Sequence, residues 1–177
     1  MNKQSKDRCM KELTHAEAIN IAANWLANQR KATSPYRSML ILREPTSYIS
    51  QIGDSEYPDI LGIFGSSNTV NIEVKVSRAD FFADKNKKHK HPFGNYKIYA
   101  CPSKMLHEDE MPEGWGLLYL SGSGGKLVKA PNRYIAADVT PIVVNILLNA
   151  VMSGAITSEH LRRPKNILQW DGKGRIL

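Results

Sequence analysis

The stretch 57–75 constrains the fold of this chain more than any other segment. It opens with a Pro-Asp pair, runs through apolar residues to Phe64, turns over residues 65–68 and ends in a second segment of alternating apolar residues. Gly, Ser and Asn in the turn are residues that reverse the chain, so the pattern predicts a β-hairpin. Such a hairpin returns Asp59, near the start of the first strand, to the neighbourhood of Glu73 in the second.

The second strand of this hairpin has two unlike faces. Because successive strand residues point to opposite sides, valine and isoleucine occupy one face, while Asn71, Glu73 and Lys75 occupy the other. Asp59 shares the face of Glu73 and Lys75 only if the numbers of opposed residues add to an even number. A two-residue turn at Ser66-Ser67 gives an odd sum, so we expect a loop of odd length or a β-bulge.

Two carboxylates and one ammonium group on one face suit the hydrolysis of a phosphodiester. That reaction needs a hard cation, and Mg²⁺ prefers one or two carboxylates together with water and substrate oxygens. We expect Asp59 and Glu73 to supply the carboxylates and Lys75 to orient the water or stabilise the developing charge. A salt-bridged surface hairpin is the alternative, because a Glu-x-Lys triplet alone occurs by chance about once in a chain of this length.

Both halves of the pattern, Pro58-Asp59 and Glu73-Val74-Lys75, resemble the signature of the PD-(D/E)xK nuclease superfamily. The resemblance implies that Asp59, Glu73 and the carbonyl of Val74 bind the metal and that Lys75 assists catalysis. The expected ion is Mg²⁺, with Mn²⁺ as a substitute.

Further segments are similar to the small MmcB-like members of that superfamily, which are associated with bacterial DNA repair and occur in phage genomes. These segments are 73–77, 79–81, 83–85, 100–102 and 112–117. The members carry a catalytic Glu at the end of the strand before the hairpin, which corresponds here to Glu44; a solvated or paired Glu is the alternative. The resemblance implies an α/β fold with a restriction-endonuclease-like mixed sheet flanked by helices, and a metal-dependent nuclease acting on DNA in repair, recombination or phage DNA processing.

The charge of the chain favours a polyanionic partner. Lys and Arg number 24 against 17 Asp and Glu, which gives a net charge of +7. We expect phosphate contacts from the basic residues that follow the active strand, namely Arg78, Lys85, Lys87, Lys88 and Lys90. A solvated basic run at a helix C-terminus is the alternative. DNA is the expected partner, RNA is not excluded, and a nucleic-acid-binding module of the same fold with little or no catalysis is the rival function.

Length suits one domain with extensions. We expect a flexible N-terminus at 1–12, a nuclease-like domain at 13–135 and a C-terminal helical extension and tail at 136–177. Two cysteines without zinc-site spacing indicate a reducing compartment, and the polar start and short apolar runs predict a cytoplasmic chain with no membrane partner. An apolar helix after Thr140 is expected to be buried or to form a dimer contact, so a homodimer stays open.

Caps and alternation predict the remaining elements. Thr14 and Glu17 form a capping box that opens a helix to about residue 30, and Glu17 is alternatively a site residue. The predicted buried stripe of that helix is Ala18, Ile21, Ala22 and Trp25. Ser77 opens a helix over about 78–88, in which Phe81 and Phe82 are expected to be buried and Asp84 to pair with Lys85. Strands are expected at 38–44, 96–101, 115–120 and 126–129, and a last helix at 158–163.

Overall fold

The computed structural model describes residues 13–31, 33–44, 58–64, 68–85, 94–122, 124–134, 144, 148, 152 and 168–170. In this part of the chain, seven strands form one mixed sheet in the order β6-β5-β4-β3-β2-β1-β7. The strands are β1 (Leu40–Arg43), β2 (Ile60–Phe64), β3 (Asn68–Val74), β4 (Tyr96–Pro102), β5 (Gly116–Ser121), β6 (Gly124–Lys129) and β7 (Leu168–Trp170). The helices are α1 (His15–Ala27) and α3 (Arg78–Lys85), with a 3-10 turn at Glu108–Glu110. The predicted α/β class is confirmed.

Strands β2 and β3 form the expected hairpin. They pair antiparallel, with Phe64 opposite Asn68 and Ile60 opposite Ile72, so the numbers of opposed residues add to an even number. Three residues, 65–67, connect the strands, and the register runs through the pairing without a shift. The prediction of an odd-length loop is therefore confirmed.

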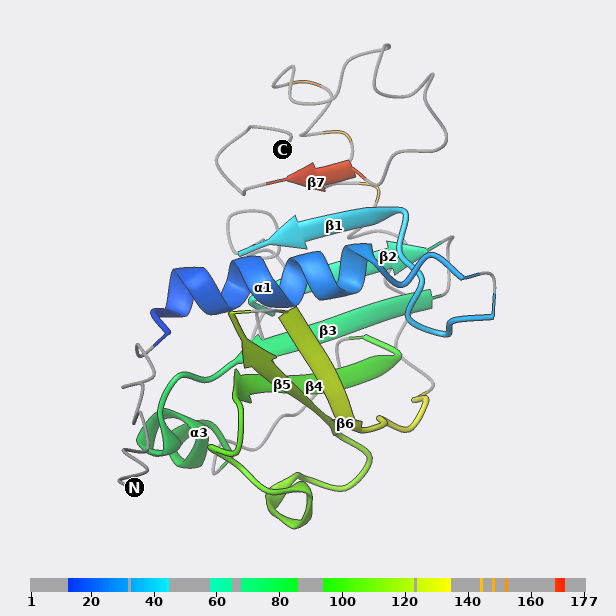
Figure 1. Ribbon diagram of the computed structural model, residues 1–177. Helices are drawn as coiled ribbons and strands as arrows, with labels where there is room; N and C mark the ends of the chain where they lie inside the picture. The colour runs from blue at the N-terminus through cyan, green and yellow to red at the C-terminus, as the bar shows by residue number, and fades with distance from the viewer. Residues whose placement is uncertain are drawn as a thin grey trace, which may run out of the picture.

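Helix α1 crosses one face of the sheet and packs on strands β1 to β6 (Figure 1). The predicted capping box is present, because the Thr14 hydroxyl accepts the Glu17 amide and the Glu17 carboxylate accepts the Thr14 amide. The buried stripe is Ala18, Ile19, Ala22, Ala23, Leu26 and Ala27, whereas Ile21 and Trp25 are only partly buried. Small residues let the helix approach closely, and at Gly62 of β2 an added Cβ would lie 2.7 Å from the Leu26 side chain.

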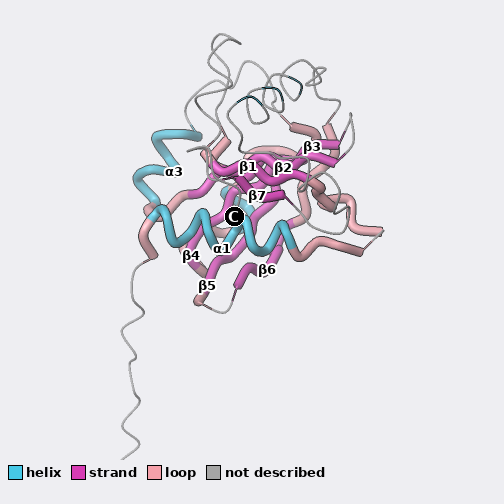
Figure 2. The backbone as a smooth tube through the Cα atoms, turned by 90° about the horizontal axis from the view of Figure 1, so that it is seen from above, coloured by secondary structure: helices cyan, strands magenta, loops and turns pink. Residues whose placement is uncertain are grey.

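The opposite face of the sheet carries a second hydrophobic cluster. It consists of Phe81, Tyr99, Cys101, Leu106, Met111, Trp115 and Leu117. Helix α3 contributes Phe81, begins four residues after the end of β3 and lies to one side of the strands, at the left in Figure 2. The Ser77 hydroxyl accepts the Asp80 amide at 3.2 Å, so the predicted cap is confirmed. Phe82 is 41% exposed, and the prediction that it is buried is wrong because it lies on the outer side of α3.

The segment expected to form a tail contributes a strand to the sheet. Leu168, Gln169 and Trp170 form β7, which pairs parallel with β1 at the edge of the sheet. Val144, Leu148 and Met152, from the apolar helix expected after Thr140, are helical and exposed, so these positions do not belong to a core. The rest of that helix, the expected helix at 158–163 and the segment 1–12 lie outside the described residues. No helix within the described residues is long and apolar enough to cross a membrane.

Candidate active site

The backbones of the hairpin residues singled out by the sequence come together where β3 ends and β2 begins, and we call this end of the strands the site edge. The start of α1, the end of β1, the start of β2 and the end of β3 all lie at this edge (Figure 1). Asp59 immediately precedes β2, and its carbonyl accepts the Glu44 amide from the end of β1 at 2.7 Å. The β2–β3 register, continued by one residue beyond Ile60 and Ile72, places Asp59 opposite Glu73.

At the end of the hairpin, the Asp59 carboxylate accepts a backbone hydrogen bond of the kind that a carbonyl of the neighbouring strand accepts elsewhere. The amide of Val74 donates to Asp59 Oδ2 at 2.7 Å, and the imidazole Nε2 of His15 lies 3.6 Å from the same oxygen. Burial raises the pKa of Asp59, and the Glu44 carboxylate adds to the rise, while the Val74 amide and His15 oppose it. The carboxyl group is thus held between two strands and the first residue of α1.

Glu73 and Val74 contribute oxygen atoms on the same edge. Glu73 is 6% exposed and lies on the sheet face turned away from α1, whereas Val74 packs into the cluster under that helix. In a strand the amide and carbonyl of one residue point toward the same neighbouring strand. Because the Val74 amide reaches Asp59, strand geometry directs the Val74 carbonyl toward the β2 side as well. The backbone therefore places the Val74 carbonyl on the same side of β3 as Asp59.

Lys75 directly follows β3, and its amide donates to the carbonyl of Ala100 in β4 at 2.9 Å. The residue is 8% exposed, and its Nζ lies 3.4 Å from Oδ2 of Asp84 in α3. Burial alone would lower the pKa of the Lys75 ammonium, but Asp84 and then Glu73 outweigh this effect and raise it. The carboxylates around Lys75 thus favour its cationic form, which suits charge stabilisation.

Asp84 is a site-lining residue that the sequence interpretation missed. Asp84 contacts Lys75 and accepts the Tyr99 hydroxyl at 2.9 Å, whereas its expected pairing with Lys85 involves a side chain outside the described residues. His15 was missed as well, since a residue one position after a helix cap carries no motif. Glu17 is occupied by the capping box described above, as the structural alternative predicted.

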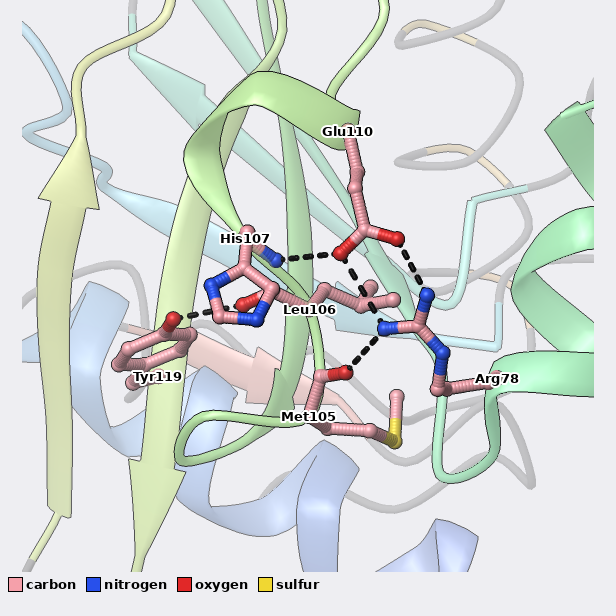
Figure 3. A network of polar contacts seen from close by, with 6 residues as sticks. All are labelled: Arg78, Met105, Leu106, His107, Glu110 and Tyr119. Carbon is pink, nitrogen blue, oxygen red and sulfur yellow. Dashed lines mark hydrogen bonds and ion pairs between the residues drawn. The ribbon is translucent and has the colours of Figure 1, made fainter.

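Arg78 belongs to a polar network that ties the start of α3 to the loop after β4 (Figure 3). Its guanidinium donates to both carboxylate oxygens of Glu110 and to the carbonyl of Met105. Glu110 also accepts the His107 amide at 2.7 Å, and the hydrogen bond from Arg78 lowers the pKa of Glu110. The guanidinium expected to bind phosphate is thus engaged within the protein, and a phosphate contact would require it to exchange partners.

The other expected nucleic-acid contacts cannot be placed at this edge. Lys87, Lys88 and Lys90 lie outside the described residues, and so does the side chain of Lys85. Glu44 is exposed at the end of β1 with a φ of 46°, and its amide, rather than its carboxylate, forms the described bond to Asp59. Among the described residues, no three His, Cys, Asp or Glu side chains are grouped to hold a metal ion.

Comparison with known proteins provides information on the fold alone. No family model and no curated protein matches this chain. A solved structure, the SPO1766 protein of unknown function from Silicibacter pomeroyi, is similar with a TM-score of 0.56 and 18% sequence identity. The similarity covers 88% of this chain and 96% of that one. The two chains therefore share an arrangement of elements over nearly their whole length.

Proposed function

We propose that this protein is a metal-dependent nuclease of restriction-endonuclease-like fold that hydrolyses phosphodiester bonds in DNA at the edge formed by Asp59, Glu73 and Lys75. The observation that carries the proposal is the hairpin register, which sets Asp59 opposite Glu73 while its carboxylate accepts the Val74 amide. The proposed roles in DNA repair, recombination or phage DNA processing rest on the family resemblance of the sequence.

The donor set fits Mg²⁺ or Mn²⁺. Asp59 and Glu73 would hold the ion together with the Val74 carbonyl, and a pair of carboxylates completed by water is the coordination that Mg²⁺ favours. When bound, the ion would neutralise phosphate charge and lower the pKa of an attacking water. The pKa of Asp59, raised mainly by burial, indicates a carboxylate whose charge a bound cation would stabilise.

The charge at the edge supports a requirement for the ion. A group of carboxylates, those of Asp84, Glu73, Asp80 and Asp59, acts on the ammonium of Lys75, and the carboxylate of Glu44 acts on Asp59. A polyanion is repelled by such a group unless positive charge is added. Lys75, held as a cation, would then donate a hydrogen bond to the water or to a phosphate oxygen as negative charge develops.

The test is the nicking of a supercoiled plasmid by the purified protein with Mg²⁺ or Mn²⁺. We expect nicking by the wild type, its loss with EDTA, and its loss in Asp59→Ala and Lys75→Ala. The exposed residues Asp109 and Lys126 provide matched controls, so Asp109→Ala and Lys126→Ala should cut as the wild type does. Equal cutting by all five proteins would contradict the assignment.

The same experiment separates the rival function. Lys75 and Arg78 are each engaged with a carboxylate of the protein, an arrangement that a binding module without catalysis could equally use. If no protein cuts but all retard DNA on a gel, the binding module is the correct interpretation. In that case, affinity should fall steeply with salt, because binding would depend on released counterions.

A further inference from the structure

We propose that Asp84 is a positioning residue for Lys75, so that helix α3 is part of the proposed nuclease site rather than only a cover of the sheet. This inference rests on the proposed function, and it follows from the contact of the two side chains. Asp84 Oδ2 lies 3.4 Å from Lys75 Nζ, and both side chains are almost fully buried.

Lys75 needs an external anchor to act reproducibly. It lies just past the last residue of β3, where the sheet holds its backbone through the bond to Ala100 but does not fix its four-carbon side chain. A free lysine side chain carries about 2 kcal/mol of rotamer entropy, and an ammonium has three donors without a preferred plane. One donor directed at Asp84 fixes the head group and leaves two donors for a water or a phosphate oxygen.

Asp84 is itself held in place from the sheet. The Tyr99 hydroxyl donates to the same Oδ2 atom at 2.9 Å. The Tyr99 ring stacks on Trp115 at 4.4 Å between centroids and meets Phe81, one helical turn before Asp84, edge to face at 5.1 Å. Two residues on the inner side of α3 thus dock on one tyrosine of β4, which fixes both the rotation of the helix and the position of the carboxylate.

Stability alone does not account for this pair. A buried ion pair commonly contributes little more than apolar residues of similar volume, because desolvation offsets the attraction. Fixing one geometry of a reactive side chain is what such a pair achieves well, and a misplacement of about 1 Å at a reacting group costs on the order of 100-fold in rate. The location of the pair next to Glu73 is where such precision would matter.

The test combines a rate measurement with a measurement on Lys75 that needs no activity. The variants are Asp84→Asn, which removes the charge and keeps an acceptor for Tyr99, and Asp84→Glu, which restores the charge. Asp109→Asn, at an exposed position that does not act on Lys75, is the matched control. The side-chain order of Lys75 is measured by NMR on lysine labelled with ¹⁵N and ¹³C, assigned with Lys75→Arg, and thermal unfolding verifies that each variant is folded.

We expect Asp84→Asn to lower the order of the Lys75 side chain and to reduce kcat about 10- to 100-fold with KM nearly unchanged. Asp84→Glu should recover part of both losses, and Asp109→Asn should change neither. Unchanged order of Lys75 in Asp84→Asn overturns the inference, and so does reduced order with wild-type kcat. If the wild type does not cut DNA while the order of Lys75 still falls in Asp84→Asn, the nuclease function fails and the anchoring of Lys75 by Asp84 stands.

Discussion

Asp59 has two separable roles, and substitution should separate them. Its carboxylate accepts the Val74 amide at 2.7 Å, and in the proposed function the same group binds the metal. Asparagine retains an oxygen that can accept the amide but lacks the charge, whereas alanine lacks both. Asp59→Asn should therefore be inactive and nearly as stable as the wild type, and Asp59→Ala should be inactive and less stable.

The difference between the variants follows from the bond and its burial. Val74 is fully buried, so its amide has no access to bulk water when the acceptor is removed. A buried donor left unsatisfied costs about 1–3 kcal/mol. The Asp59 side chain is 21% exposed, which places the loss in Asp59→Ala toward the lower half of that range. In Asp59→Asn the neutral amide oxygen is a weaker acceptor for the Val74 amide, which lowers stability. The variant also no longer buries a charge, the cost that raises the pKa of Asp59, and this raises stability. We therefore expect the free energy of unfolding to change by no more than about 1 kcal/mol.

Urea unfolding at pH 7, without divalent ions, measures both variants against the wild type. We expect midpoints that fall in the order wild type, Asp59→Asn, Asp59→Ala, with equal slopes, since the surface exposed on unfolding is the same. Adding Mg²⁺ should raise the midpoint of the wild type and of neither variant, because an ion that binds only the native state stabilises it. If Asp59→Ala proves as stable as Asp59→Asn, the Val74 bond contributes nothing and the structural half of the reasoning is refuted.

Three further predictions concern the support of the site. Gly62→Ala should destabilise the protein by about 1–3 kcal/mol in urea unfolding, since the added methyl overlaps side chains under α1; a neutral result would contradict the close helix approach. In a Cys9→Ser background, Cys101 should resist Ellman's reagent at pH 8 until the protein unfolds, because burial raises the pKa of this thiol to about 11; rapid labelling of the native protein would contradict its burial. Glu110→Gln should lower the urea midpoint at pH 7, and the difference from wild type should vanish as the pH falls through the depressed pKa of Glu110, where the wild type also loses the charge; a difference that persists in acid would implicate the shape of the loop instead.

The hairpin and the helix caps could be predicted because local rules determine them. A capping box needs only residues three apart, and Thr14 with Glu17 satisfied it as expected. Alternation along β3 identified the buried face, and arithmetic on the register identified the loop length. Strand β7 could not be predicted in the same way, because three residues carry no periodic signal and their pairing with β1 joins distant parts of the chain.

The phase of a helix against the sheet is the other quantity that local patterns leave undetermined. For α1, the small residues that allow close approach placed the buried stripe on Ala18, Ala22 and Leu26 rather than toward Trp25. For α3, adjacent Phe81 and Phe82 looked equivalent in sequence, yet neighbours on a helix point about 100° apart, so only one faces the sheet.

The same phase decides which charges belong to the site. Asp84 lies three residues after Phe81 and therefore shares its inward face. When Phe81 packs against Tyr99, the rotation of α3 is fixed, and this rotation places the carboxylate of Asp84 beside the Lys75 ammonium. The position of the Lys75 side chain, at the end of β3, thus depends on how Phe81 of the following helix packs against the sheet.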